Sequence, residues 1–365
     1  MSDPAPSPPG SVTSARVTTG KQVNVTLPPP HDDFSSAVMR RFVDLDTNRD
    51  GFISKDDVNR ALQDAAFTAD DAAMVATLKG ALGDLESLSA DELGWENDGI
   101  TRADITEYDR IRSRDPKQTA IVKIQRRFAF AKSKIAARSA NLFDGDPDVL
   151  SVRQGLIGDC WFLAALVALG LRDPVEVRKL IRPAKSAGKF IVKFPGVAGE
   201  ITVSKPTDGE LAIFALANGL WLPVLEKSYG AAANRDALFF VESSDVDAVD
   251  GGDFISTGIE VMSGRSTDMD VLSTTFETTT RDKLKDAMAK KKLVTAGVRG
   301  ELLGQSLRDN GLPMGHAYTV MGFDPKSDKL KLRNPWGHVG LPFGEVFEQT
   351  ITEFDASFSM IAYEE

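Results

Sequence analysis

One segment of this chain leaves little choice about where it must lie once folded. Residues 160–169 read Cys-Trp-Phe-Leu-Ala-Ala-Leu-Val-Ala-Leu, without a charged side chain. A helix over this segment would be apolar on all of its faces, and such a helix lies inside a protein core. The preceding loop contains Gly155 and Gly158, so we expect the helix to begin at Cys160. The sequence therefore predicts a domain built around a buried helix with a thiol in its first turn.

The chain before this segment divides into three parts. Residues 1–30 are rich in Pro, Ser and Thr, lack apolar periodicity, and are predicted to be a disordered tail. Residues 31–115 carry apolar side chains at helical spacing, such as Phe34 and Val38, and predict short helices. Residues 116–141 predict a basic amphipathic linker helix, because lysines and arginines flank an apolar stripe and no acid is present.

From residue 142 onward the pattern is mixed. Strand-like apolar runs follow the buried helix at residues 190–194, 293–298, 317–323 and 329–333. The last two runs are separated by Asp-Pro-Lys-Ser-Asp, which is typical of a hairpin turn. Helices first and strands later predict an α+β fold class, preceded by an all-α part.

Composition excludes several classes of protein. The 365 residues are 42% hydrophobic and 26% charged, which is ordinary for two or three globular domains. No apolar run approaches the roughly 20 residues that span a membrane, and the first residues do not resemble a secretory signal. A net charge of −10 disfavours nucleic acid as a partner. The single cysteine cannot form an internal disulfide, so we expect a cytoplasmic protein.

The scarcity of cysteine and histidine directs attention to a few residues. A lone cysteine is either an inert core thiol or a nucleophile, and the N-terminus of a helix favours its thiolate form. His316 begins one predicted strand and Asn334 follows the next, so a hairpin would bring both to its open end. Asn334 would orient the imidazole, and His316 would accept the proton of Cys160. We interpret His31 and His338 as surface or loop residues.

An oxyanion site requires donors beside the nucleophile. The side-chain amide of Gln154 and the backbone N–H of Cys160 are suitable donors. Each residue also has an ordinary explanation when taken alone. Cys160 would be a buried helix thiol, His316 a strand-end histidine, Asn334 a turn residue before proline, and Gln154 a loop residue. It is their joint occurrence, in this order, that favours catalysis.

Several stretches resemble the calpain family of cysteine proteases. Residues 154–165, Gln-Gly-Leu-Ile-Gly-Asp-Cys-Trp-Phe-Leu-Ala-Ala, resemble the cysteine segment of that family. Gly-His-Ala-Tyr at 315–318 resembles its histidine segment, and Arg-Asn-Pro-Trp-Gly at 333–337 its asparagine segment. Residues 221–229 and the pair Gly251-Gly252 resemble further family stretches. The resemblance covers roughly residues 142–365.

This resemblance implies a cysteine endopeptidase acting on protein or peptide substrates. It assigns Cys160 as nucleophile, His316 as base, Asn334 as orienting residue and Gln154 as oxyanion donor, and it makes Trp336 a shield over the histidine. It implies a papain-like core of two subdomains, with the cysteine in residues 142–235 and the histidine and asparagine in residues 236–365. We expect a short, atypical relative without the C-terminal modules of larger calpains.

Residues 46–57 fit the calcium loop of an EF-hand. Gly51 allows the sharp turn, and Ser54 is placed to act through water. Asp57 holds the closing position, where glutamate is usual, so we expect weaker calcium binding or more tolerance of magnesium. The alternative is a solvated acidic turn. The expected Ca²⁺ ligands are Asp46, Asn48, Asp50, the carbonyl of Phe52, and Asp57.

Other parts of the calcium chemistry are expected to be missing. Residues 95–104 resemble a second loop that is one residue short, so we expect it to pack as a mate of the first and to bind little metal. Typical calpain cores bind calcium through two carboxylates, where this chain has Ser151 and Gly340. We therefore do not expect the core to bind calcium in that way.

Two questions remain open at this level. Basic amphipathic helices are targets of calcium-opened EF-hands, so calcium would regulate access to Cys160 if the linker helix changed its docking surface. The alternative is a passive connecting helix.

The second question is the function of the whole chain. The alternatives to an endopeptidase are a catalytically dormant calcium-binding interaction protein and an acyl transferase of the transglutaminase type. The intact Cys160, His316, Asn334 and Gln154 set disfavours the dormant protein, and the Asn disfavours the transferase, which usually has Asp.

Overall fold

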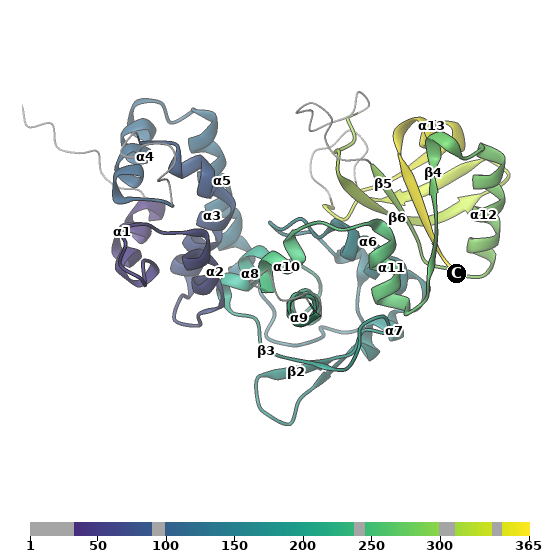
Figure 1. Cartoon of the computed structure of the whole chain (residues 1–365), viewed down its shortest axis with the longest axis horizontal. Helices are drawn as coiled ribbons and strands as arrows, with labels where there is room; N and C mark the ends of the chain where they lie inside the picture. The colour runs from purple at the N-terminus through teal and green to yellow at the C-terminus, as the bar shows by residue number, and fades with distance from the viewer. Residues whose placement is uncertain (1–32, 90–98, 237–244, 299–310, 338–344) are drawn as a thin grey trace, which may run out of the picture.

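The computed structural model describes residues 33–89, 99–236, 245–298, 311–337 and 345–365. The predicted tail, His31, His338 and residues 95–98 of the predicted second loop lie outside these residues. The described chain is α+β, and it begins with helices that gather on one side of the molecule (Figure 1). These helices are α1 (Asp33–Leu45), α2 (Lys55–Gln63), α3 (Ala69–Glu86), α4 (Arg102–Arg114) and α5 (Thr119–Ala136).

Local sequence determines where α2 and α4 begin, the helices that follow the first and the second predicted loop. Ser54 caps α2 by accepting from the backbone N–H of Asp57, whose carboxylate accepts from Ser54 in return. Thr101 and Asp104 form the same capping box at α4. The residues just before these caps pair with each other through an antiparallel bridge between Ile53 and Ile100, with N···O distances of 2.9 and 3.1 Å.

The middle of the chain surrounds the apolar helix α6 (Cys160–Arg172). As the apolar composition predicted, every residue from Cys160 to Gly170 is buried. The neighbouring elements include a small antiparallel sheet in the order β1-β2-β3. They are η1 (Val149–Ser151), α7 (Pro174–Lys179), β1 (Ile181–Pro183), β2 (Lys189–Val192), β3 (Ile201–Ser204), α8 (Asp208–Ile213), α9 (Trp221–Asp236), α10 (Asp245–Asp250) and α11 (Ile255–Ser263).

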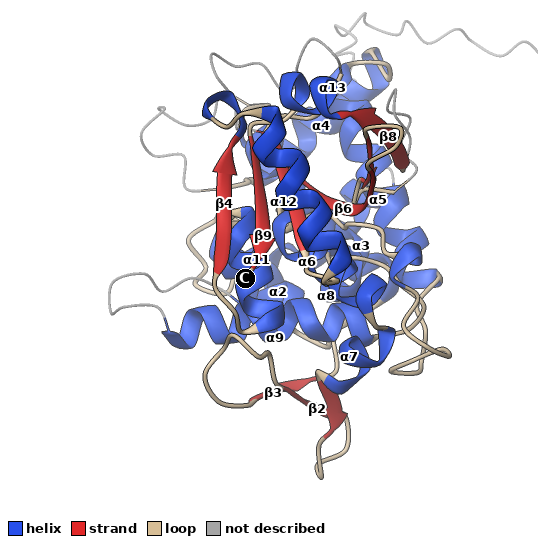
Figure 2. Cartoon of the chain, turned by 90° about the vertical axis from the view of Figure 1, so that its right-hand side faces the viewer, coloured by secondary structure: helices blue, strands red, loops and turns tan. Residues whose placement is uncertain are grey.

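The last third forms an antiparallel sheet in the order β4-β9-β5-β6-β7-β8. Helix α12 lies over one face of this sheet, and α6 and α11 pack on the other (Figure 2). The sheet therefore contacts the apolar helix α6 directly. Its elements are β4 (Thr267–Val271), η2 (Leu272–Thr274), α12 (Glu277–Ala289), β5 (Val294–Val298), β6 (His316–Asp324), β7 (Lys329–Arg333), β8 (Val346–Thr350), α13 (Ile351–Ser357) and β9 (Met360–Glu364).

The hydrophobic core of the N-terminal helices does not end at α5. It continues into the middle of the chain through Ile157, Ile213 and Phe214, which belong to the same buried cluster as Ile124 and Phe128 of α5. The loop before Cys160 therefore packs directly against the helical part. Within the residues that the structure describes, no helix has the length and apolarity to cross a bilayer.

Candidate functional site

The thiol of Cys160 lies at the point where α6 meets strand β6. The residue is the first of the helix and is 8% exposed. The backbone N–H of Ala317, on β6, donates to the sulfur and favours its anion. Burial acts in the opposite sense and is stronger, so the pKa of the thiol is raised to about 11.

His316 and Asn334 meet at the open end of the expected hairpin. Strands β6 and β7 pair antiparallel, with Asp324 opposite Lys329 beside the turn. At the other end, His316 Nε2 lies 2.9 Å from Asn334 Oδ1, and both side chains are buried. Asn334 Oδ1 also accepts from the backbone N–H of Trp336, at 2.9 Å, so it is the amide oxygen that faces the ring. His316 Nε2 therefore carries the hydrogen, which leaves Nδ1 as the basic nitrogen.

Trp336 and burial control the environment of the imidazole. The indole ring lies 4.3 Å from the His316 ring, measured between centroids, and helps to exclude water from the His316–Asn334 hydrogen bond. Burial lowers the pKa of His316 to about 4, against an opposing contribution from Asn334.

These pKa values disagree with the expectation that Cys160 is a thiolate because it lies at a helix N-terminus. With the pKa of Cys160 near 11 and that of His316 near 4, the neutral thiol and neutral imidazole predominate at pH 7. Desolvation of the buried sulfur outweighs the favourable field of the first helical turn. A neutral thiol can attack a carbonyl group only if it also gives its proton to a base.

Gln154, the first residue of the cysteine segment, contacts the asparagine segment. Its backbone N–H donates to the carbonyl of Pro335 at 2.9 Å, and its Nε2 donates to the carbonyl of Ile157 at 2.7 Å. The Nε2 group has a second hydrogen for another acceptor. The following residue must be glycine, because a Cβ at Gly155 would lie 1.8 Å from the carbonyl oxygen of Ile213.

Arg333 supports this arrangement, although no pattern in the sequence had assigned it a role. Its buried guanidinium donates from Nη2 to the carbonyls of Leu150, at 3.1 Å, and Val152, at 2.6 Å. It also contacts Glu345 Oε1 at 3.0 Å. Arg333 thus ties the strand before Asn334 to the segment before Gln154. The sequence did contain one sign of this role. Arg333 lies in a predicted strand beside Asn334, where a buried charged side chain requires partners.

The predicted calcium loop turns its carboxylates inward. Asp46 accepts from the backbone N–H groups of Asp50 and Gly51, each at 3.1 Å, and Asp50 accepts from that of Phe52 at 3.0 Å. Gly51 has a φ of 94°, which accounts for glycine at the turn. Asn48 joins this network through its amide, 2.5 Å from Asp50. The oxygen donors at these positions suit a hard cation such as calcium.

Asp57, at the closing position, is bound to other groups. Its carboxylate accepts from Ser54 Oγ at 2.6 Å and pairs with Arg60 Nη1 at 3.0 Å. Burial raises the pKa of Asp57, but the hydrogen bonds from Ser54 and Arg60 outweigh it and leave the pKa lowered. In the described part of the chain, no three His, Cys, Asp or Glu side chains are already arranged around a metal position. A cation in the loop would have to displace Arg60 from Asp57.

Of the two core positions where typical calpains hold calcium, the structure describes the one at Ser151. The hydroxyl of Ser151 donates to the carbonyl of Asp148 at 2.7 Å, so this side chain is engaged in a local turn and supplies no carboxylate. The second position, Gly340, lies outside the described residues.

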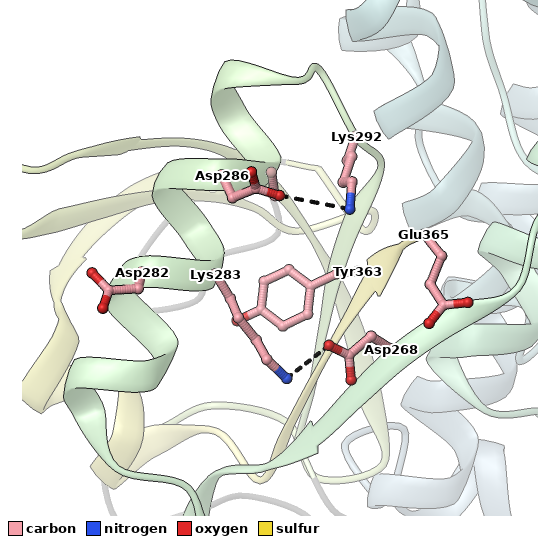
Figure 3. A pocket seen from close by; sticks show the side chains of 8 residues that line it. Asp268, Asp282, Lys283, Asp286, Lys292, Tyr363 and Glu365 are labelled. Atoms are coloured by element: carbon pink, nitrogen blue, oxygen red, sulfur yellow. Dashed lines mark ion pairs between the residues drawn. The ribbon is translucent and has the colours of Figure 1, made fainter.

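A cavity of about 510 Å³ lies between α12 and the edge of the large sheet (Figure 3). Its charged side chains largely pair with each other, as in Lys283 with Asp268 at 2.8 Å and Lys292 with Asp286 at 3.7 Å. Neither Cys160 nor His316 lines it. This cavity is therefore separate from the α6–β6 junction.

Comparisons with known proteins agree on one family. The family model described as calpain family cysteine protease matches residues 113–342, which includes α5. Calpain-14 of Homo sapiens is 28% identical over 211 residues, which cover 52% of this chain and 28% of that protein. Calpain-12 of Homo sapiens is 29% identical over 214 residues, and the calpain-type cysteine protease DEK1 of Arabidopsis thaliana is 24% identical over 215. The matches cover 27% of calpain-12 and 9% of DEK1, so the chain spans a minor part of these relatives.

Proposed function

Because the chain belongs to the calpain family of cysteine proteases, we propose that it is an endopeptidase that uses Cys160, His316 and Asn334. The observation that carries this proposal is the His316–Asn334 hydrogen bond of 2.9 Å beside the strand that binds the Cys160 sulfur. It leaves Nδ1 as the basic nitrogen of His316, the residue before Ala317, whose backbone N–H donates to the Cys160 sulfur. The proposed core is papain-like, with residues 142–235 carrying the cysteine and 236–365 the histidine and asparagine.

The proposed reaction proceeds in two stages. The sulfur of Cys160 attacks the carbonyl carbon of the scissile peptide while its proton passes to His316 Nδ1. The backbone N–H of Cys160 and the free amide hydrogen of Gln154 donate to the developing oxyanion. His316 then donates its proton to the leaving amine. Water, activated by His316, cleaves the thioester and regenerates the thiol.

Alkylation by an epoxide tests this function directly. Since Cys160 is the single cysteine, we expect one equivalent of label and none in Cys160→Ser. His316→Ala should lose both labelling and cleavage of an unfolded protein substrate. Wild-type protein that is labelled but cleaves no substrate under any condition would support the dormant protein instead, for which the burial and raised pKa of Cys160 are the specific argument.

We also propose that residues 31–115 form an EF-hand pair in which the first loop binds calcium. The proposed ligands are Asp46, Asn48, Asp50, the Phe52 carbonyl and Asp57. The bridge between Ile53 and Ile100 supports a paired arrangement, because it joins the two loop regions in the way that mates share a short sheet. The second loop is proposed to bind little metal.

Calcium titration tests the EF-hand proposal. Calcium should raise the melting temperature of the wild type, and Asp46→Ala should abolish this rise. The control is Asp44→Ala, an exposed carboxylate on α1 that pairs with Arg41 outside the loop. An equal response of both variants would contradict the assignment. Substrate cleavage with and without calcium, in wild type and Asp46→Ala, then shows whether calcium regulates the protease.

A further inference from the structure

The peptide group between Ile157 and Gly158 lies in the loop before Cys160, and side chains hold both of its ends. Its carbonyl oxygen accepts from Gln154 Nε2 at 2.7 Å, and its N–H donates to Asp250 Oδ1 at 2.6 Å. Because both groups belong to one planar unit, the direction of the N–H fixes that of the carbonyl. The amide of Gln154 is thus bound to a peptide group whose orientation depends on Asp250.

This peptide group also determines which end of the Gln154 amide is the donor. The atom that lies 2.7 Å from the Ile157 oxygen must be the nitrogen, since two carbonyl oxygens do not hydrogen-bond to each other. Nε2 uses one hydrogen in this contact and retains the other for the oxyanion. If the 157–158 peptide rotated, Gln154 Nε2 would lose the acceptor that holds it. The peptide therefore couples the oxyanion donor to the side chain of Asp250.

Asp250 belongs to a short helix that approaches the loop closely. It is the last residue of α10, where the helix dipole disfavours an anion, so α10 itself gives no reason for a carboxylate here. A Cβ at Gly158 would lie 3.0 Å from the backbone oxygen of Asp250 and 3.5 Å from its Oδ1. A carboxylate also accepts a stronger hydrogen bond from an N–H than a neutral group does. The contact with Gly158 accounts for an aspartate at this position.

Helix α10 is held by the N-terminal helices. Asp247 accepts from Asn59 Nδ2 of α2 at 2.7 Å and pairs with Lys55 at 3.3 Å. Lys79 of α3 also pairs with Asp247 and lies 4.0 Å from Asp250 Oδ2. In Figure 1, α10 lies between these helices and α6. The position of the Asp250 carboxylate is thus set by elements that contain none of the proposed catalytic residues.

We propose that Asp250 is a positioning residue that holds the oxyanion donor Gln154 in place through the 157–158 peptide. This inference rests on the proposed function in taking Gln154 as that donor. No motif in the sequence had assigned Asp250 a role. Asp250 touches no reacting atom, so its loss should slow the chemical step and leave the binding of a peptide substrate unchanged.

The test measures kcat and KM separately for cleavage of a peptide by full-length variants. Asp250→Ala should lower kcat about tenfold and leave KM within about twofold, because the oxyanion forms only as the reaction proceeds. Asp250→Asn keeps an oxygen that can accept from Gly158, so its kcat should stay within about threefold of wild type. Asp245→Ala is the control, since it removes a carboxylate of the same helix that binds Asn234 and not the loop, and it should match the wild type.

A double variant distinguishes positioning of Gln154 from general support of the fold. Gln154→Ala should lower kcat about 100-fold, the usual cost of losing one oxyanion donor. If Asp250 acts through Gln154, adding Asp250→Ala to Gln154→Ala should lower kcat less than about twofold further. A further tenfold loss in the double variant overturns the proposal. So does a wild-type kcat in folded Asp250→Ala, or an Asp250→Asn as slow as Asp250→Ala.

Two further results are decisive. Asp250→Glu keeps the charge but moves the carboxylate by one methylene, so it should also lower kcat. It takes the place of Asp250→Ala if that variant does not fold, and a wild-type kcat in Asp250→Glu then overturns the proposal. A wild-type protein that cleaves no peptide refutes the proposed function and this inference with it. An active wild type whose kcat does not respond to these substitutions refutes this inference alone.

Discussion

At the scale of single residues, the contact between His316 and Asn334 assigns the two imidazole nitrogens to different tasks. Asn334→Ala removes the acceptor at 2.9 Å and frees the ring to rotate or change tautomer. A buried hydrogen bond of this kind contributes on the order of 1–3 kcal/mol, so we expect kcat/KM to fall about 10- to 100-fold. Peptide cleavage is the measurement, and Asn141→Ala, at an exposed site bonded to Asp144, is the control. A loss below about threefold would contradict the orienting role.

The burial of His316 predicts an acid-sensitive fold. Its pKa is about 4 in the folded protein, against 6.5 for an unperturbed imidazole, so the unfolded chain binds a proton first as the pH falls. The free energy of unfolding should therefore decrease between about pH 6.5 and pH 4, by at most roughly 3 kcal/mol, and no further below both values. Urea titrations at several pH values measure this, and His316→Gln should have a flatter profile. Identical slopes for the two proteins would refute it.

Sequence was sufficient for some residue-level features and not for others. The spacing of two strands around a short turn predicted that His316 and Asn334 would be close, because a hairpin returns its ends to the same place. It did not predict the neutral state of Cys160, since burial of the sulfur depends on how α6 packs on β6, far along the chain.

At the scale of elements, the crossing of α6 and α11 depends on one glycine. A Cβ at Gly258 would lie 2.5 Å from the carbonyl oxygen of Trp161, so Gly258→Ala must separate the helices. We expect a loss of about 1–3 kcal/mol in stability by urea denaturation. Gly83→Ala, on α3 with nothing within 4 Å of the new Cβ, should instead be neutral or stabilising by up to about 1 kcal/mol. Equal effects at both positions would show that the close approach is not a constraint.

The helix after the proposed calcium loop contains a side chain that would compete with a cation for Asp57. Arg60 lies one turn after Asp57 and contacts its carboxylate at 3.0 Å, so a bound cation must break this ion pair. Arg60→Gln should therefore tighten calcium binding several-fold in calorimetric titration. Arg110→Gln is the matched control, because Arg110 forms the same i,i+3 pair with Glu107 on α4. Weaker binding in Arg60→Gln than in the control would contradict this account.

Elements differ in how well local sequence predicts them. Helix α6 and strands β5 to β7 were expected, because long apolar runs and a turn define them without help from the rest of the chain. Strands β1, β3, β4, β8 and β9 were not expected. β4, with the sequence Thr-Asp-Met-Asp-Val, has few apolar residues and becomes a strand by pairing with β9, about ninety residues later.

At the scale of the whole molecule, the two halves of the protease region are joined at both ends of α6. Near the N-terminus of α6, Arg333 binds the carbonyls of Leu150 and Val152. Along the helix, Thr319 Oγ1 donates to the carbonyl of Ala164 at 2.8 Å. At the C-terminus of α6, Arg172 pairs with Glu364 of β9. The site between the halves therefore depends on contacts remote from it, which no local motif specifies.

The ion pair between Arg172 and Glu364 provides a test of this dependence. Glu364 Oε1 and Oε2 accept from Arg172 at 3.0 and 2.7 Å, and its carboxylate is 1% exposed. Glu364→Gln can still accept from the backbone N–H of Leu293, which lies 2.9 Å away, but it loses the charge that holds the arginine. Since Arg172 is partly exposed and keeps Glu176 as a partner, we expect a loss of roughly 1–2 kcal/mol in urea denaturation.

The same substitution at the other partner of Arg172 is the control. Glu176→Gln removes a more exposed carboxylate from the same arginine, within the first half of the protease region, and should cost less than about 0.5 kcal/mol. If the link between the halves matters for the site, Glu364→Gln should also lower kcat/KM for a peptide, while Glu176→Gln leaves it unchanged. Equal stability and equal activity in the two variants would mean that the ion pair between Arg172 and Glu364 does not help to hold the halves together.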